Sequence, residues 1–338
     1  MPTATAGAAA AGAGTGASLA EGSLNALIED TARFKLCGGQ LVLRIRLASD
    51  EVASLKEPAP LFCLASRLAY PPFLFNDVYE HFKLCLPPRM GQSYEISSLM
   101  WFDYNNVALR WHYPLGVLCD VLVGREVPNP WDLTVHFRGT SSKELLPFTG
   151  LGDLQKTVMS AFRQAVFLQQ GSAAPFMKLP KQQQQQLWDS IKGTNLEAYD
   201  EVQRQLLCQS LSRCRSLAVR LHLSGPPAEG TGGGGRVHVA VLQPVPPMGE
   251  DGRPTTVCSF LRRVVPPLLC PEPVPVDDDA VQLLEGAEVL AHGLCIPLET
   301  PLYWLALNGT YMDHFVHLVV RLPAGLLREP GSGRRGDG

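Results

Sequence analysis

The sequence predicts an α+β protein in which two ubiquitin-like β-grasp domains flank a helix-rich domain, preceded by an N-terminal helix. Both outer sections order short apolar strands around one amphipathic helix that ends at a Pro-Pro pair. The middle section instead has apolar residues at helical spacing. We expect these segments: a tail over 1–21, the N-terminal helix over 22–35, the first β-grasp domain over 36–140, the helix-rich domain over 141–213, the second β-grasp domain over 214–323, and a tail over 324–338.

Composition fits a globular protein and excludes several classes. Hydrophobic residues make up 46% of the 338 residues and charged residues 18%. The net charge of -3 argues against a dedicated nucleic-acid binder, although a local basic patch could still contact acidic lipid. Nine scattered cysteines without a C-x-x-C pair favour reduced, mostly buried thiols over disulfides or a zinc site. No apolar stretch reaches the ~18 residues of a membrane span, so we expect a soluble protein.

The N-terminal region is predicted to begin as a tail and continue as a helix. Residues 1–20 contain no Lys or Arg, which argues against a targeting peptide. Ser23 is a candidate N-cap for an amphipathic helix over 23–33, with Leu24 and Leu27 on one face.

The first β-grasp domain is predicted from alternating strands and turn signals. Asn105-Asn106 separates two short strands, as in a hairpin. The expected order is a strand over 40–47, a strand over 61–68, a helix over 75–84, strands over 98–104 and 108–111, a short helix over 115–122, and a strand over 131–137.

The middle section is predicted to hold three helices. In the first, over 153–169, Leu154 and Val158 begin an apolar stripe that leaves Lys156 and Arg163 on the opposite side. The glutamine run at 182–186 leads into apolar residues with helical periodicity, so we interpret it as a helix face that ends at Gly193. A third helix is expected over 196–211.

The last section repeats the logic of the first. We expect strands over 217–223 and 237–242 around a Gly/Pro-rich loop at 225–235, and a helix over 256–265. An acidic loop at 277–279 should precede a strand over 288–292, a short helix over 302–307 and a final strand over 315–322.

Nothing in the sequence indicates catalysis or a cofactor. No hydrolase elbow, zinc-protease motif or phosphate-binding loop is present. His314 and His317 would lie on opposite faces of a strand, so a metal site is disfavoured and turn or surface positions are expected. Cys119 lies in an apolar run and is expected to be packed. The aromatic residues around Trp111 and Tyr113 are either core residues or part of a partner groove.

Several motifs resemble the autophagy protein 5 family. The segments 101–104, 109–116 (Leu-Arg-Trp-His-Tyr-Pro-Leu-Gly) and 130–137 (Pro-Trp-Asp-Leu-Thr-Val-His-Phe) are similar to the family's first ubiquitin-like domain. The segments 292–293 and 298–305 (Leu-Glu-Thr-Pro-Leu-Tyr-Trp-Leu) are similar to its second, and 186–188 (Gln-Leu-Trp) matches its helical domain. The resemblance covers about residues 23–323.

The resemblance implies a non-enzymatic scaffold without cofactor or metal. Family members are joined by an isopeptide bond to ubiquitin-like autophagy protein 12 and bind the N-terminal helix of autophagy protein 16 in a groove. The complex acts like an E3 ligase, recruiting the E2-like enzyme that attaches autophagy protein 8 to phosphatidylethanolamine. The implied location is cytoplasmic, with peripheral contact at the phagophore membrane. We predict the partner groove near Leu24, Leu27, Trp111 and Tyr113.

One position departs from the family pattern. Alignment places Arg163 where the family has its acceptor lysine, and a guanidinium that stays protonated is a poor nucleophile. Lys156 lies two turns earlier on the same face and is a possible substitute. The pairing with autophagy protein 12 is therefore expected to be non-covalent or to use a displaced lysine. An unrelated enzyme or regulator that uses ubiquitin-like folds for binding is the alternative.

Overall fold

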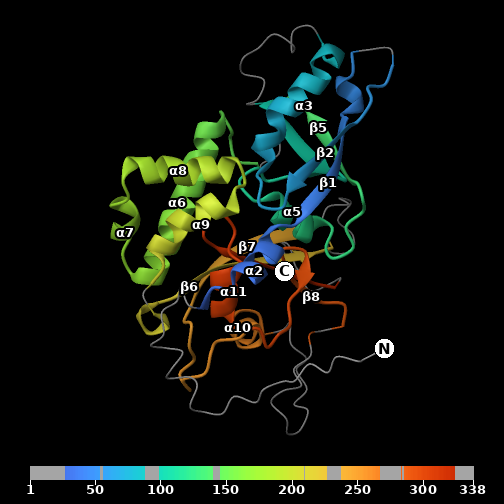
Figure 1. The fold of residues 1–338 in the computed structure, drawn as a ribbon. Helices are drawn as coiled ribbons and strands as arrows, with labels where there is room; N and C mark the ends of the chain where they lie inside the picture. Colours follow the sequence, from blue (N-terminus) through green and yellow to red (C-terminus); the bar gives the residue numbers. More distant parts are fainter. Residues whose placement is uncertain are drawn as a thin grey trace, which may run out of the picture.

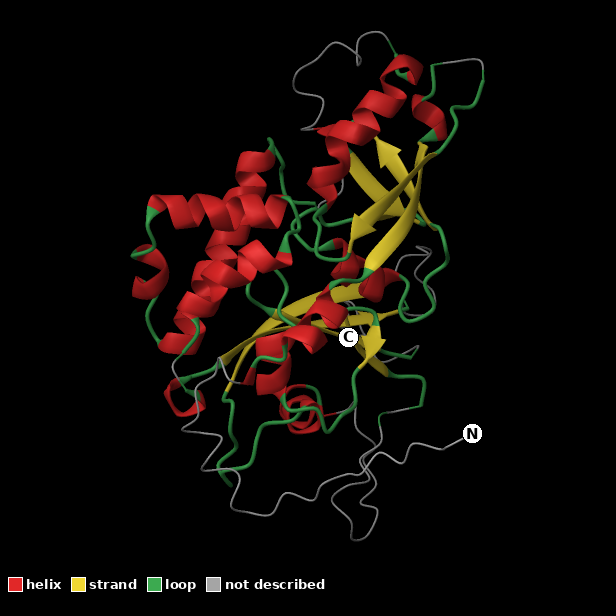
Figure 2. Cartoon of the chain, in the orientation of Figure 1, coloured by secondary structure: helices red, strands yellow, loops and turns green. Residues whose placement is uncertain are grey.

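The computed structural model describes residues 27–53, 56–87, 99–139, 145–208, 210–226, 237–266, 283 and 285–323. Figure 1 shows three parts: a sheet domain at the upper right, a group of helices at the left, and a second sheet domain below. Figure 2 shows the same arrangement with the strands confined to the two sheet domains. The predicted fold class is confirmed.

The first domain is a five-stranded sheet with the order β2-β1-β5-β3-β4. Its central pair, β1 and β5, is parallel, and the other neighbours are antiparallel. Apolar residues of β1 alternate with exposed ones, and the buried set packs with helices α3 and α5 in one core. The elements are β1 (Gln40–Leu47), β2 (Leu61–Ser66), α3 (Phe75–Phe82), β3 (Trp101–Tyr104), β4 (Val107–Ala108), α5 (Leu115–Leu122) and β5 (Trp131–His136).

The hairpin between β3 and β4 follows its turn signal. Asn105 and Asn106 both have positive φ, 51° and 64°, which a two-residue turn of this kind requires. The strands are shorter than predicted: β3 begins at Trp101 and β4 ends at Ala108. Trp111 lies beyond β4 because the chain turns there toward α5.

The helical domain consists of α6 (Leu151–Gln170), α7 (Ala174–Met177), α8 (Lys181–Lys192) and α9 (Leu196–Gln203). Helix α6 ends at Gly171, whose φ of 72° is the left-handed conformation common after helix C-termini. Asn195 caps α9 by accepting a hydrogen bond from the Ala198 amide. The predicted extension of α9 to residue 211 is wrong, because Leu206 packs into the first core whereas Leu211 packs into the second.

The second domain repeats the first, with the strand order β7-β6-β10-β8-β9 and a central parallel pair, β6 and β10. Its elements are β6 (Leu217–Gly225), β7 (Val237–Val245), α10 (Val257–Val264), β8 (Glu288–Ala291), β9 (Leu294–Cys295), α11 (Leu302–Asn308) and β10 (Val316–Arg321). Strand β8 ends before the predicted residue 292 because His292 and Gly293 take positive φ in a turn. Most of the predicted loop at 225–235 and the acidic loop at 277–279 lie outside the described residues.

The N-terminal helix, α2 (Asp30–Cys37), begins later than the predicted 22–35. Leu27 and Ile28 precede it and pack against the second core instead of forming its first turn. Arg33 and Cys37 are its buried residues. Ser23 and Leu24 lie outside the described residues.

The three parts share one packed interior. The first core contains α6 residues together with Leu290, Tyr311 and Val319 of the second domain. A buried ion pair joins Arg67 to Asp120, and Asp120 also accepts a hydrogen bond from the Gly293 amide at 3.0 Å. Because buried charges require partners, this contact fixes the second domain against the first.

Candidate partner-binding sites

Helix α6 presents an exposed stripe on the side opposite its apolar face. Leu154, Val158, Phe162 and Ala165 are buried in the shared interior. The stripe is formed by Lys156, Ser160, Arg163, Gln164 and Phe167. The predicted division of this helix is therefore correct, with Lys156 and Arg163 on one face.

The two basic residues of this stripe differ in surroundings. Arg163 forms no ion pair with any described residue. The ammonium group of Lys156 lies 3.8 Å from Asp153, and its side chain is 83% exposed, so this ion pair is weak. Seven residues of helix separate them, which is about 10 Å along the axis.

Lys156 also borders a pocket where the three domains meet. Its walls include Tyr70 and Tyr113 of the first domain, α6, and Leu242 of β7. Arg220 and Asp313 form an ion pair at 3.0 Å in this pocket. Burial and the nearby arginines lower the pKa of His112, another wall residue, to about 4, so its ring is neutral at physiological pH.

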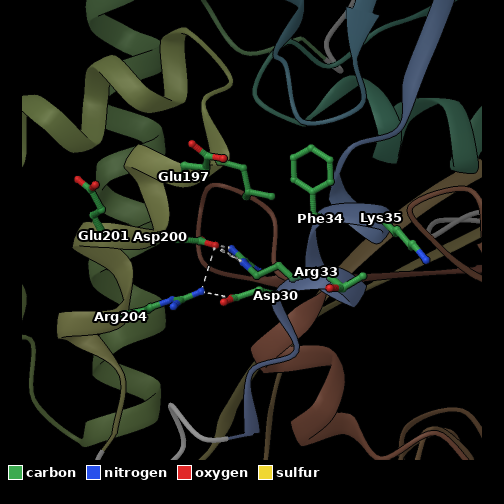
Figure 3. Close-up of a pocket in the computed structure, with 10 residues that line it drawn as sticks. Asp30, Arg33, Phe34, Lys35, Glu197, Asp200, Glu201 and Arg204 are labelled. Carbon is green, nitrogen blue, oxygen red and sulfur yellow. Dashed lines mark hydrogen bonds and ion pairs between the residues drawn. The ribbon is translucent and has the colours of Figure 1, made fainter.

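A second groove lies between α2 and α9 (Figure 3). Phe34 of α2 is 62% exposed on one side of it. Glu197 and Glu201 of α9, which are one turn apart and exposed, line the other side with Leu196. The groove thus combines an exposed aromatic ring with an acidic wall.

An ionic network holds this groove together. The guanidinium of Arg33 donates three hydrogen bonds to the Asp200 carboxylate, at 3.0, 2.8 and 2.7 Å (Figure 3). Burial is the largest single influence and lowers the pKa of Arg33, but the hydrogen bond to Asp200 and the electrostatic attraction of Asp200 and its neighbours together outweigh burial, so the pKa rises overall. Arg204, directly after α9, pairs with Asp30 and lies 4.0 Å from Asp200, so each side of the groove contributes one acid and one base. The geometry of the two helices is therefore fixed before any partner arrives.

The start of α2 is anchored to the second domain. The Glu29 amide donates to the Asn308 side chain at 2.8 Å, and the Trp304 indole donates to the Glu29 carboxylate at 3.0 Å. Arg33 also donates to Thr310 at 3.3 Å. The groove is thus built on contacts with both the helical domain and the second sheet domain.

The four predicted groove residues do not form one surface with this groove. Leu24 lies outside the described residues, and Leu27 is half-buried against the second core. Trp111 is buried and donates to the Leu146 carbonyl at 2.8 Å. Tyr113 is buried beside the histidines of the second sheet. The core interpretation of these aromatic residues is the one their burial fits.

Sequence reasoning missed Phe34, Asp200 and Arg204. The two helices of the groove are more than 150 residues apart in the sequence, so periodicity within either helix cannot show that they meet. The sequence offered one signal, an aromatic residue, Phe34, among the charged residues of 30–35. In the structure Arg33 is the buried residue of this stretch, and Phe34 is not among the buried ones.

The described histidines and cysteines are largely buried and in contact with other side chains. His314 lies in the turn before β10, as expected, and only His317 is in the strand. Both histidines are buried, so the expectation of surface positions is wrong. His317 contacts Asp313 at 3.0 Å and His222 at 2.9 Å, while His314 stacks on Phe162. No group of three metal-ligating residues occurs in the described ranges. Cys119 is fully buried as predicted, and burial raises the pKa of its thiol to about 12.

Comparison with protein families identifies the same three parts. The UblA domain model of autophagy protein ATG5 matches residues 36–137, the family's alpha-helical bundle region matches 152–208, and its UblB domain matches 216–320. The chain belongs to the autophagy protein 5 family. None of these family descriptions names an enzyme, and membership gives the chain a role in autophagy.

Relatives of the family differ in how much of the chain they match. Autophagy protein 5 of Oryza sativa subsp. indica is 32% identical over 172 residues, which are 51% of this chain and 43% of that protein. The Arabidopsis thaliana protein is 33% identical over 50% of this chain and 48% of its own length. The chain thus matches less than half the length of these plant relatives. The Aspergillus clavatus protein is 26% identical over 84% of this chain and 94% of its own length.

A solved structure of the family has the same fold. The crystal structure of Kluyveromyces marxianus Atg5 aligns with a TM-score of 0.66, covering 86% of this chain and 99% of that one at 20% identity. Among the described residues, no helix is both long and apolar enough to cross a bilayer.

Proposed function

We propose that this protein is a non-catalytic scaffold of autophagosome formation. It pairs with ubiquitin-like autophagy protein 12 and with autophagy protein 16, and the assembly acts like an E3 ligase for the lipidation of autophagy protein 8. The observation that carries the proposal is the order of three family domains, UblA, helical bundle and UblB, along the chain. The fully buried Cys119, with its raised thiol pKa, fits a protein that leaves thioester chemistry to the E2-like enzyme.

The pairing with autophagy protein 12 takes place on the exposed stripe of α6 and does not use the usual acceptor. Arg163 is exposed and lacks an ion pair with described residues, so its guanidinium is available for a bidentate contact with a partner carboxylate. A large complementary interface can hold two proteins without a covalent bond. Lys156 is the displaced acceptor if a bond forms.

The helix of autophagy protein 16 binds in the groove between α2 and α9. Phe34 offers an aromatic anchor for the apolar face of such a helix, and Glu197 and Glu201 suit basic residues at its edge. This groove replaces the one predicted from the sequence, because Trp111 and Tyr113 are buried elsewhere.

The scaffold works in the cytoplasm and contacts the phagophore membrane peripherally, through the assembled complex. It recruits the E2-like enzyme whose cysteine carries autophagy protein 8. It needs no cofactor of its own.

Co-expression with both partners from the same organism tests the proposal. Co-elution of the three proteins in gel filtration, with this chain at its own mass on a denaturing gel, is the expected result. A Phe34→Asp variant should lose autophagy protein 16 and keep autophagy protein 12, whereas Phe167→Asp should not lose autophagy protein 16. Failure of both partners to co-elute with the wild-type protein would contradict the scaffold.

The alternative class is an enzyme or regulator that uses its ubiquitin-like folds for binding. ATPase, protease and thioester assays on the purified protein separate the two, because the scaffold should be inactive in all three.

A further inference from the structure

The outer strand of the first sheet carries exposed apolar side chains that neither core explains. Phe62 and Leu64 of β2 are 59% and 67% exposed. Val42 of β1 is directly opposite Leu64 in the ladder, so the apolar groups adjoin on the open face of the sheet. The opposite face of β1, with Leu41, Leu43 and Ile45, is the one buried in the core.

Strand β2 is also the edge of its sheet. It pairs with β1, and no other described strand pairs with its outer side. Exposed edges are usually protected by charged residues, Pro or bulges. The six residues Leu61–Ser66 include none of the charged types and no Pro. By contrast β7, the long edge of the second sheet, contains Pro244 and has half-buried side chains.

The charge beside the apolar patch indicates the chemistry of its occupant. Arg44 is opposite Phe62 in the ladder and binds Asp132. Arg46 also lies near Asp132, at 3.7 Å, and its side chain is half exposed. Two guanidinium groups therefore share one carboxylate, leaving a net positive charge at one end of the patch.

We propose that this edge docks an extended, acidic segment of another protein, which adds as a sixth strand beside β2. The backbone of the docked segment pairs with β2. Its apolar side chains on the open face of the sheet contact Phe62 and Leu64, and one of its carboxylates reaches Arg46. A second copy of this chain is a poorer occupant, because its own edge strand, Leu61–Ser66, contains no carboxylate that could reach Arg46. This surface is distinct from the α6 stripe and the α2–α9 groove.

NMR titration of the ¹⁵N-labelled full chain tests the proposal. The probes are two hexapeptides with blocked ends. In each, valine, valine and aspartate occupy every second position and threonine occupies the others. The second peptide has the reverse residue order of the first. We expect amide shifts confined to β1 and β2, with affinity in the range of about 1 mM. Leu64→Lys should weaken binding at least about tenfold, and Leu84→Lys, at a fully exposed leucine off the sheet, should not change it.

Two further peptides separate the parts of the proposal. Replacing the central threonine by proline should abolish binding, since the strand pairing is lost. Replacing the peptide's aspartate by lysine should weaken its binding to the wild-type protein. The same lysine peptide should bind more tightly to the Arg46→Glu variant. The proposed occupant would be overturned if no amide of β2 shifts, or if the proline peptide binds as well as the parent peptide. It would also be overturned if the wild type forms a dimer, or binds phosphatidylserine vesicles, and Leu64→Lys abolishes that dimer or that binding.

Discussion

His136 lies between two carboxylates on the open face of the first sheet. Its Nε2 contacts Asp103 at 2.6 Å, its Nδ1 is 3.6 Å from Glu51, and Trp101 stacks on the ring at 3.9 Å. Burial is the largest single influence and lowers the pKa of His136, but the hydrogen bond to Asp103 and the attraction of the Asp103 and Glu51 carboxylates together outweigh it and raise the pKa to about 9. The ring is therefore charged at neutral pH.

This raised pKa predicts a loss of stability at alkaline pH. The folded state holds the proton more tightly than the unfolded state, so the stabilisation is full below pH 6.5 and disappears as pH rises through about 9. Relative to His136→Gln, the wild-type free energy of unfolding should fall by up to about 3 kcal/mol between pH 6 and 9.5. Urea titrations at both pH values measure it, and an unchanged difference would contradict the assigned pKa.

Breaking the Arg33–Asp200 pair should destabilise the protein strongly. Asp200→Asn leaves the Arg33 charge buried with only neutral partners, at a cost of about 3 kcal/mol. Arg204→Gln is the matched control, because its pair with Asp30 is exposed, its 4.0 Å contact with Asp200 is long, and the two are worth less than about 1 kcal/mol. Denaturant midpoints give both values, and equal effects would show that burial does not govern this network.

Among the elements, those with a complete local signal were predicted best. Strand β1 and helix α5 have the predicted bounds, because alternation and a short apolar run between Pro114 and Gly124 define them locally. Helix α2 and the end of α9 were misplaced. Leu27, before α2, and Leu211, after α9, both pack on the core of the second domain, so the chain is not helical at these positions. Local periodicity cannot predict such tertiary contacts.

The apolar stripe of α6 should tolerate no charge, whereas its exposed stripe should. Val158→Asp places a carboxylate in the shared interior and should make the protein insoluble or lower its melting temperature by well over about 10 °C. Gln164→Asp, on the exposed stripe of the same helix, should leave the melting temperature nearly unchanged. Differential scanning fluorimetry compares them, and a soluble Val158→Asp protein with a normal melting temperature would show that α6 does not anchor the domains.

At the scale of the whole molecule, the sites depend on how the domains meet. The positions of Lys156 and Arg163 on one face follow from helical periodicity, so the sequence alone was sufficient. The α2–α9 groove joins residues from distant segments, and which residues line it together is shown only by the packed structure. The docked arrangement of the domains determines which surfaces stay open.

The exposed stripe of α6 allows a gain-of-function prediction. Arg163→Lys places an ε-amine at the acceptor position predicted from the sequence, and a lysine amine can attack a thioester where a guanidinium cannot. Arg163 has no ion pair with described residues, so the substitution should change the melting temperature little. With the conjugation enzymes and autophagy protein 12 of the same organism, the variant should give a product at the summed mass that survives boiling in detergent.

The lysines of the wild-type chain provide the controls for that reaction. If Lys156 is a displaced acceptor, the wild-type protein gives the same product and Lys156→Arg removes it, while Lys178→Arg leaves it unchanged. If pairing is non-covalent, the wild type co-elutes with autophagy protein 12 without a boiled-stable band, and only Arg163→Lys produces one. Mass spectrometry of the wild type and of Arg163→Lys gives the contrary outcome. A bond to one and the same other lysine in both would show that Arg163 does not occupy the acceptor position. The positions on α6 can be told apart in this way, because two turns of helix move the amine by about 10 Å.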